Sequence, residues 1–192
     1  MNKETIVQFV CFSTPLETGE FMEMWEPYAK LLVSDMANII LQEGSQEKNS
    51  NKINYVSQHT SKTNDFNFAF MKGKSKSHFP EHKARIKQVG GYQAVSPFSV
   101  YQKTKGDVKV MAFVGHNEID LDFYREQTFR HLNIYQAYFE NCAYGYVMEF
   151  FLPVKESENL LTQLRGRPGV EAAVFKECRF STASKKVSSS LL

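Results

Sequence analysis

The sequence has no apolar run close to the ~20 residues that a membrane-spanning helix requires, so we expect no membrane partner. Its three cysteines, Cys11, Cys142 and Cys178, are widely spaced and form no CxxC pair. This pattern is typical of reduced thiols and argues against a disulfide framework or a cysteine metal site. The stretch 1–12 also lacks the charged and apolar regions of a signal peptide, so we expect a cytoplasmic protein.

Motifs for several kinds of chemistry are missing as well. There is no HExxH and no Cys/His cluster, and Pro80 separates His78 from His82, so we predict no metal site. There is no GxSxG motif for a nucleophile, and Gly90-Gly91 is a lone pair, unlike a phosphate loop. The net charge of +2 argues against dedicated nucleic-acid binding, so we expect no nucleic-acid partner.

Aromatic residues, by contrast, are abundant. The chain has 192 residues, of which 42% are hydrophobic and 14% aromatic, including 16 Phe and 9 Tyr. This length allows one large domain or two small ones, and the aromatic content predicts sheets with bulky side chains on their buried faces.

The first third of the chain predicts a strand followed by a helix. Residues 5–13, TIVQFVCFS, are typical of a strand buried on both faces. Thr14 is a predicted helix cap, with Pro15 in the first turn and Glu17 completing a capping box. An apolar stripe then follows at helical spacing, and Pro27 is expected to kink or divide the helix.

The next elements end in an aromatic strand and a short helix. We expect strands over 38–43 and 53–60, and a third over 66–71, where Phe66, Phe68 and Phe70 share one face. A helix is expected over 80–89, with His82 on its inward face and a stop at Gly90-Gly91. Residues 92–102 are then expected to form a closing strand.

The second half repeats this plan. Residues 146–180, like 66–104, predict an aromatic strand, a short helix, a Gly-containing stop and a second strand. Before them we expect a strand over 108–114 and a helix from Asp120. This helix either runs on to Phe139 or stops near Leu132 and leaves a strand over 134–140; the second option is favoured because it completes the module. The closing elements are expected at 144–152, 157–165 and 169–180. The predicted domains are therefore 1–105 and 106–181, followed by a disordered tail over 182–192.

Each half then has the order β-α-β-β-α-β, a ferredoxin-like module whose antiparallel sheet carries both helices on one face. The predicted fold class is α+β, with two tandem modules whose sheets pack face to face as a barrel. In this pattern the chain resembles the dimeric α+β barrel superfamily, which includes antibiotic-biosynthesis-type monooxygenases and muconolactone-isomerase-like proteins. No motif selects one family within that group.

The resemblance implies that a small, partly aromatic molecule binds between sheet and helices of one module. In the first module His59 and His82 are the candidate catalytic histidines, able to move a proton, orient a phenol or ligate haem iron. Candidate ligand-binding residues are the aromatic side chains nearby: Trp25, Tyr28, Tyr55, Phe68 and Phe70. The implied activity is a cofactor-independent monooxygenation or isomerisation, although no signature identifies a cofactor.

Three alternatives remain open from the sequence. The aromatic residues could be plain core in a non-catalytic scaffold or oligomerisation module. An RNA-recognition module shares the topology, and 67–71, NFAFM, is similar to its base-stacking strand, in which case the Phe side chains would be exposed. Sheet edges left open by the barrel could also pair between chains in a homodimer.

Overall fold

The computed structural model describes residues 5–32, 39–48, 50–62, 68–95, 104–116 and 131–178. The predicted helix from Asp120, the predicted tail over 182–192 and most of the predicted strand 92–102 lie outside these residues. The described strands are β1 (Thr5–Ser13), β2 (Ile40–Gly44), β3 (Tyr55–Lys62), β4 (Arg85–Ala94), β5 (Asp107–Val114), β6 (His131–Ala137), β7 (Tyr146–Pro153) and β8 (Val170–Glu177). The described helices are α1 (Thr18–Leu32), α2 (Phe68–His78) and α4 (Val154–Arg165).

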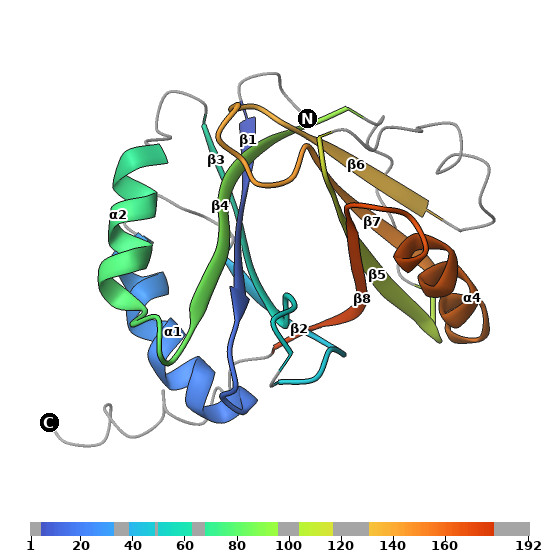
Figure 1. Cartoon of the computed structure of the whole chain (residues 1–192), viewed down its shortest axis with the longest axis horizontal. Coiled ribbons are helices and arrows are strands. Elements are labelled where there is room, and N and C mark those ends of the chain that lie inside the picture. The colour runs from blue at the N-terminus through green and yellow to red at the C-terminus, as the bar shows by residue number, and fades with distance from the viewer. Residues whose placement is uncertain are drawn as a thin grey trace, which may run out of the picture.

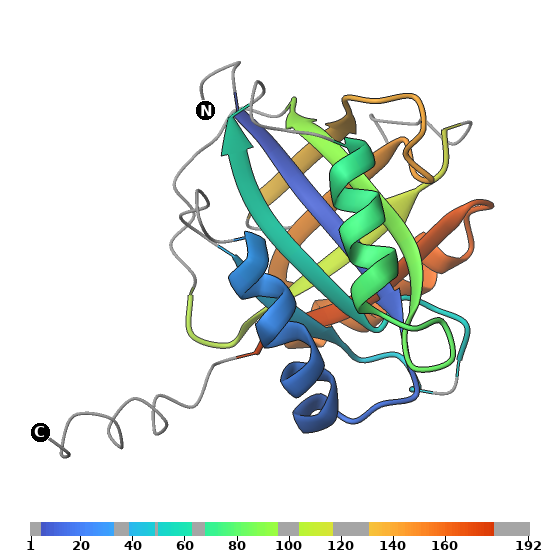
Figure 2. The ribbon, with the colours of Figure 1, turned by 90° about the vertical axis from the view of Figure 1, so that its left-hand side faces the viewer.

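The eight strands close into one barrel in the order β1-β3-β2-β8-β5-β7-β6-β4, with every neighbouring pair antiparallel. Helices α1 and α2 cover one side of the barrel, and α4 covers the opposite side (Figures 1 and 2). The predicted α+β class and the predicted barrel are therefore confirmed.

Alternate residues of each strand face the barrel interior, or lumen, and the others face the helices. On β1, Phe9 and Cys11 belong to the interior cluster, whereas Val10 and Phe12 pack against α1 and α2. This explains why 5–13 contains an almost unbroken apolar run: both of its faces are buried. The interior cluster draws on seven of the strands and contains Val7, Phe9, Cys11, Ile53, Val56, Tyr92, Met111, Phe113, Tyr135, Cys142, Val147, Ala173 and Phe175.

The two half-sheets meet at two short seams. Residues 42–44 of β2 pair with 175–177 of β8, and 92–94 of β4 pair with 135–137 of β6. By comparison, β1 and β3 share eight pairs, as do β5 and β7. The homodimer was predicted from sheet edges left open by the barrel. Because both seams are closed, most of these edges pair within one chain. The homodimer stays a prediction.

A glycine makes the β2–β8 seam possible. Gly44 is the direct register partner of Phe175, whose ring lies over it. A Cβ atom at Gly44 would come within 2.9 Å of that ring, so any side chain there would displace it.

Two elements of the first half differ from the sequence prediction. The predicted strand 66–71 is wrong, because α2 (Phe68–His78) occupies most of it, and this removes the strand on which the RNA-recognition alternative depended. The predicted helix 80–89 is also wrong, because a turn leads into β4 at Arg85. Gly90 does not stop a helix; it lies in β4 beneath the Tyr92 ring, where a Cβ atom would come within 2.7 Å.

Topology explains why the 68–78 segment is helical. Strand β1 lies between β3 and β4, so the connection from β3 to β4 has to cross the face of the sheet. A helix makes this crossing, as α4 does from β7 over β5 to β8 in the second half. The segment 68–78 contains no β-branched residue, so its local preference does not oppose a helix.

Helix α1 begins later than predicted and runs through its proline. The Glu17 N–H donates to Glu20 Oε2 at 3.3 Å, so the cap from a side chain three residues on lies at Glu17 and not at Thr14. Pro27 removes the N–H that would bond to the carbonyl of residue 23, and the next carbonyl, of Met24, accepts the His78 Nε2–H at 2.8 Å. This bond joins α1 to α2 beside the proline.

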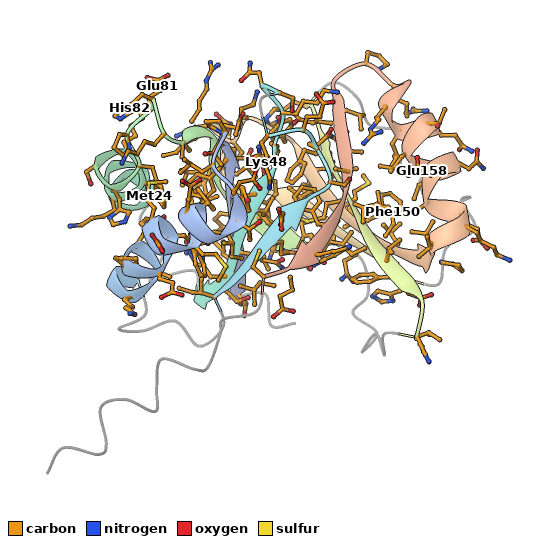
Figure 3. All side chains as sticks on the ribbon, turned by 90° about the horizontal axis from the view of Figure 1, so that it is seen from below. Met24, Lys48, Glu81, His82, Phe150 and Glu158 are labelled. Carbon is orange, nitrogen blue, oxygen red and sulfur yellow. The ribbon has the colours of Figure 1, made fainter. Side chains whose placement is uncertain are left out.

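The second half follows the prediction more closely. Strands β5, β7 and β8 and helix α4 lie within a few residues of their expected bounds, and β6 occupies the predicted strand near 134–140. On α4 the buried residues follow the spacing of one helix face: Ser157, Leu160, Leu161 and Leu164. Figure 3 shows Phe150 of β7 beside α4, and Glu158 of α4 is exposed.

The helical assignment of 68–78 has a direct test. Gly73 lies within α2, and a Cβ atom there would meet nothing within 4 Å. Gly73→Ala should therefore raise the free energy of unfolding by about 0.5–1 kcal/mol, measured by urea denaturation. The matched Gly44→Ala change should lower it by about 1–3 kcal/mol, because the Phe175 ring has to move. No gain from Gly73→Ala would contradict the helix.

Candidate functional site

The aromatic residues predicted to bind a ligand in the first half form core. Trp25, Tyr28 and Tyr55 are all 0% exposed and pack between the sheet and α1–α2. The Trp25 Nε1–H donates to Ser57 Oγ at 3.0 Å, and the Tyr28 hydroxyl bonds to Ser75 Oγ at 2.7 Å. Burial raises the pKa of Tyr28 to about 12, so this phenol stays neutral. Their polar atoms are therefore bonded within the protein.

The Tyr55 hydroxyl lies in a small charged cluster. It accepts a bond from Lys48 Nζ at 2.7 Å and donates to Thr18 Oγ1 at 3.2 Å, while Lys48 also bonds to Glu43 Oε1. Burial alone would raise the pKa of Glu43, but the bonds from Lys48 and Thr18 outweigh it and lower that pKa. Burial likewise raises the pKa of Tyr55. The cluster fixes the tip of Tyr55 and leaves it unsuited to contact a ligand.

His59 is buried on the same helix-facing side of β3. Its exposed fraction is 1%, and its Nε2 bonds to Gln8 Oε1 on the neighbouring strand β1. Because Oε1 is an acceptor, Nε2 carries the hydrogen and Nδ1 keeps a lone pair, which has no partner among the described residues. Burial lowers the pKa of His59 to about 4, so the ring is neutral at pH 7.

His82 lies apart from this layer. The sequence prediction placed it on the inward face of a helix, but it is exposed on the turn between α2 and β4. Figure 3 shows His82 and its neighbour Glu81 on the outside of that turn. The structure therefore does not bring His59 and His82 together, and the side chains of Phe68 and Phe70 lie outside the described ones.

A second buried polar cluster lies within the lumen. The Glu149 carboxylate accepts the Tyr135 hydroxyl at 3.0 Å and the Asn133 amide at 3.1 Å, and Lys109 Nζ lies 3.5 Å away. Burial, reinforced by the Glu149 charge, raises the pKa of Tyr135. Each of these groups is bonded to another within the protein, so the cluster satisfies polar atoms in the lumen.

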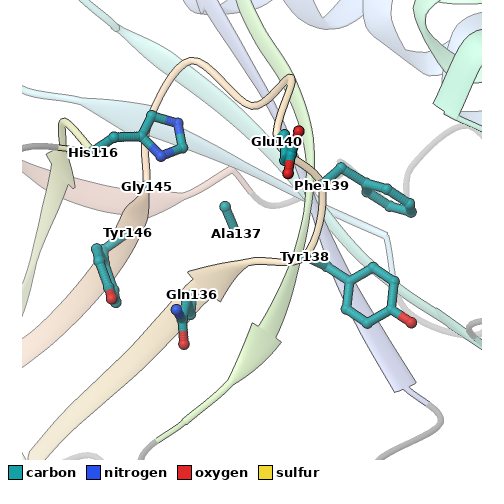
Figure 4. A pocket seen from close by; sticks show the side chains of 8 residues that line it. All are labelled: His116, Gln136, Ala137, Tyr138, Phe139, Glu140, Gly145 and Tyr146. Carbon is teal, nitrogen blue, oxygen red and sulfur yellow. The ribbon is translucent and has the colours of Figure 1, made fainter.

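A pocket with an imidazole in its wall is found in the second half, beside the loop that joins β6 to β7. This loop pocket has a volume of about 310 Å³ and lies where β5 ends and β7 begins (Figure 4). It is lined by His116, Gln136, Ala137, Tyr138, Phe139, Glu140, Gly145 and Tyr146. The walls thus combine aromatic rings with several hydrogen-bonding groups.

The orientation of His116 follows from its hydrogen bond. Its Nε2–H donates to the Cys142 carbonyl at 2.7 Å, so Nδ1 of the neutral ring carries the lone pair. Gly145 packs closely against this histidine: a Cβ atom there would come within 3.1 Å of Nδ1 and 3.0 Å of His116 Cα. Figure 4 shows the imidazole, Gly145 and Tyr146 on one side of the pocket, and Glu140 and Tyr138 on the other.

The loop pocket can therefore accept a hydrogen bond from a small ligand and contact its ring. Its volume lies near the lower end of the range for small-molecule sites. From the sequence, Gln136, Tyr138, Glu140 and Tyr146 were not recognised as a site, because His116 comes beside them only when β5 pairs with β7. His116 at the end of a predicted strand was the one available signal.

Comparisons with known proteins show the fold. Two mutants of the chlorite dismutase from Candidatus Nitrospira defluvii are similar to this chain. One, in complex with cyanide, has a TM-score of 0.54 and 6% identity and covers 93% of this chain and 92% of its own. The other has a TM-score of 0.51 and 7% identity, with 92% of both chains covered.

A protein described as a putative chlorite dismutase has a TM-score of 0.51 and 10% identity, covering 92% of this chain and 95% of its own. No protein-family model and no curated protein matches the chain. At these identities the likeness shows the shared ferredoxin-like α+β barrel fold alone. None of the described helices is long and apolar enough to cross a bilayer, and Cys11, Cys142 and Cys178 are free thiols.

Haem ligation, one of the roles expected for the first-half histidines, does not fit the described residues. The lone pair of His59 is buried in a filled layer, where Trp25 and Tyr28 are completely covered. The loop pocket beside His116 is of a size for a small molecule and not for a porphyrin.

The burial of His59 predicts an acid-dependent loss of stability. The unfolded chain binds a proton near pH 6.5 and the folded chain only near pH 4, so the folded state holds fewer protons between these values. The free energy of unfolding should fall by about 3 kcal/mol as pH drops from 6.5 to 4, and level off below that.

Urea denaturation across this pH range measures the effect. In His59→Gln the slope of the unfolding free energy against pH should be smaller by about one proton. The exposed His82→Gln change serves as the control and should keep the slope; equal slopes in both variants would contradict the burial of His59.

Proposed function

We propose that this protein binds a small aromatic molecule carrying a hydroxyl group in the loop pocket. The observation that carries the proposal is the imidazole in its wall: His116 donates through Nε2 to Cys142 and therefore offers Nδ1 as an acceptor. A phenolic hydroxyl is the simplest donor for that lone pair. The rings of Tyr138, Phe139 and Tyr146 supply apolar contact for the rest of the ligand.

The polar part of the pocket includes a carboxylate besides the imidazole. Glu140 brings a carboxylate to the side opposite His116, and Gln136 brings an amide. The negative charge of Glu140 would repel a ligand that carries a carboxylate, whereas it would not repel a neutral hydroxyl donor. The proposed ligand class is therefore a neutral phenol, in keeping with the partly aromatic ligand that the resemblance implied.

Catalysis would be a second step built on the same atom. Proton abstraction from a bound phenol is what a cofactor-independent oxygenation or isomerisation would need, and Nδ1 of His116 would be the atom that accepts that proton. The role expected for His59 and His82 would then belong to His116. The alternative is a non-catalytic scaffold, which the filled lumen and the filled helix layers favour.

We also infer that 1–105 and 106–181 are two ferredoxin-like modules in one chain. In support, the barrel order is β4-β1-β3-β2 in the first half and β8-β5-β7-β6 in the second. The first, second, third and fourth strands of each half thus occupy the same places. The two short seams fall at the joins between these halves.

Binding of phenol tests the loop pocket. Phenol titrated into ¹⁵N-labelled protein should shift the amide signals of 137–140 and 145–146 saturably in NMR spectra. Anisole, which has the same ring but no hydroxyl donor, should bind about tenfold more weakly, because it makes no bond to Nδ1. In His116→Phe, which keeps a ring but not the lone pair, phenol and anisole should bind alike.

His82→Gln is the control for this measurement, since His82 is an exposed histidine in the other half of the chain. It should leave the preference for phenol over anisole unchanged. If phenol and anisole shift the same signals equally in the unaltered protein, the acceptor role of His116 is wrong. An absence of saturable shifts in the loop would favour the scaffold alternative.

A further inference from the structure

Positive charge is concentrated in one short segment. Residues 73–87 carry five Lys and Arg and one Glu, a net charge of +4, whereas the whole chain carries +2. The rest of the chain is therefore slightly acidic. The segment includes the end of α2, the turn that follows and the start of β4, so its charges gather in one region of the surface.

A cavity opens in this region. This α2–β4 cavity has a volume of about 410 Å³ and is lined by Lys76, Phe79, Glu81, Ala84, Arg85 and Ile86. Phe79 is 2% exposed, Ala84 is 1% exposed and Ile86 is half-buried, so these residues form an apolar floor. Lys76 and Arg85 are exposed at its margin.

The two basic groups at the margin are not neutralised. Within the described ranges neither Lys76 nor Arg85 forms an ion pair, and Arg85 Nη1 donates to the neutral amide oxygen of Asn51 at 3.2 Å. That bond orients Arg85 without cancelling its charge. Glu81 contributes the single carboxylate among the lining residues.

We propose that the α2–β4 cavity binds a small organic anion. Its apolar body would pack on Phe79, Ala84 and Ile86, and its anionic group would pair with Lys76 and Arg85. This site is independent of the loop pocket, which lies in the other half of the chain and offers a carboxylate and an acceptor nitrogen. The loop pocket would thus select a neutral hydroxyl donor, and the α2–β4 cavity would select an anion.

The same charges have a competing explanation. The first half of β4 pairs with β1 on one edge, but on the other edge β4 pairs with β6 only through 92–94. Lys and Arg on an open strand edge discourage pairing with another chain. Protection of a strand edge, however, requires only the charges. A site for an organic anion also requires an apolar cavity beside them, and this cavity is present.

Sodium benzoate is the probe that separates these explanations. Titrated into ¹⁵N-labelled protein, it should shift the amide signals of Phe79, Ala84 and Ile86 saturably, and more weakly as salt is added. Benzyl alcohol, a neutral molecule of similar shape, should shift them little. Lys76→Gln and Arg85→Gln should each weaken benzoate binding by about fivefold.

A variant with a higher affinity for benzoate separates loss of the site from damage to the fold, because a damaged fold would not bind more tightly. Glu81→Gln removes the one lining carboxylate and should tighten benzoate binding by about twofold. Lys155→Gln, at an exposed position on α4, should change nothing. Equal shifts with benzoate and benzyl alcohol, or shifts spread evenly over all surface lysines, would overturn the proposal and leave edge protection as the explanation.

Discussion

Closure of the sheet at two short seams is the constraint on which the rest of the structure depends. Each seam has three residue pairs, extended by single backbone bonds such as Ser45 N–H to the Val174 carbonyl and Val95 N–H to the Ile134 carbonyl. With both seams closed, the aromatic faces of the two half-sheets are removed from water together. Gly44 matters because it lets the Phe175 ring lie across one seam.

A closed and filled barrel limits where a ligand can bind. The lumen and both helix layers are occupied by side chains, and buried polar groups such as Glu149 and Tyr28 are bonded within the protein. Polar tips that were predicted to contact a ligand instead hold the core together. Among the described residues, the loop pocket and the α2–β4 cavity lie at the margins of the barrel, where a loop or a turn departs from a strand end.

The two proposed sites follow from that arrangement. The loop pocket lies beside the β6–β7 hairpin, with acceptor groups from His116 and Glu140. The α2–β4 cavity lies where a crossing helix returns to the sheet, with donors from Lys76 and Arg85. Each lies at a connection, where a strand begins or ends, and side chains there can vary without disturbing the core.

The sequence alone was sufficient for the class of fold, because burial on both faces leaves a continuous apolar run in β1, β5 and β7, and because α4 carries a clear helical stripe. The prediction from sequence was wrong over 66–89: alternating Phe residues over 66–71 indicated a strand, and 80–89 was predicted as a helix. Only the tertiary structure decided that this segment crosses β1 as a helix, and that Gly90 lies under Tyr92 instead of ending a helix. The candidate sites were likewise decided by the fold. His116 comes beside the β6–β7 loop only when β5 pairs with β7, and Lys76 and Arg85 line one cavity only because 68–78 is a helix that turns back into β4.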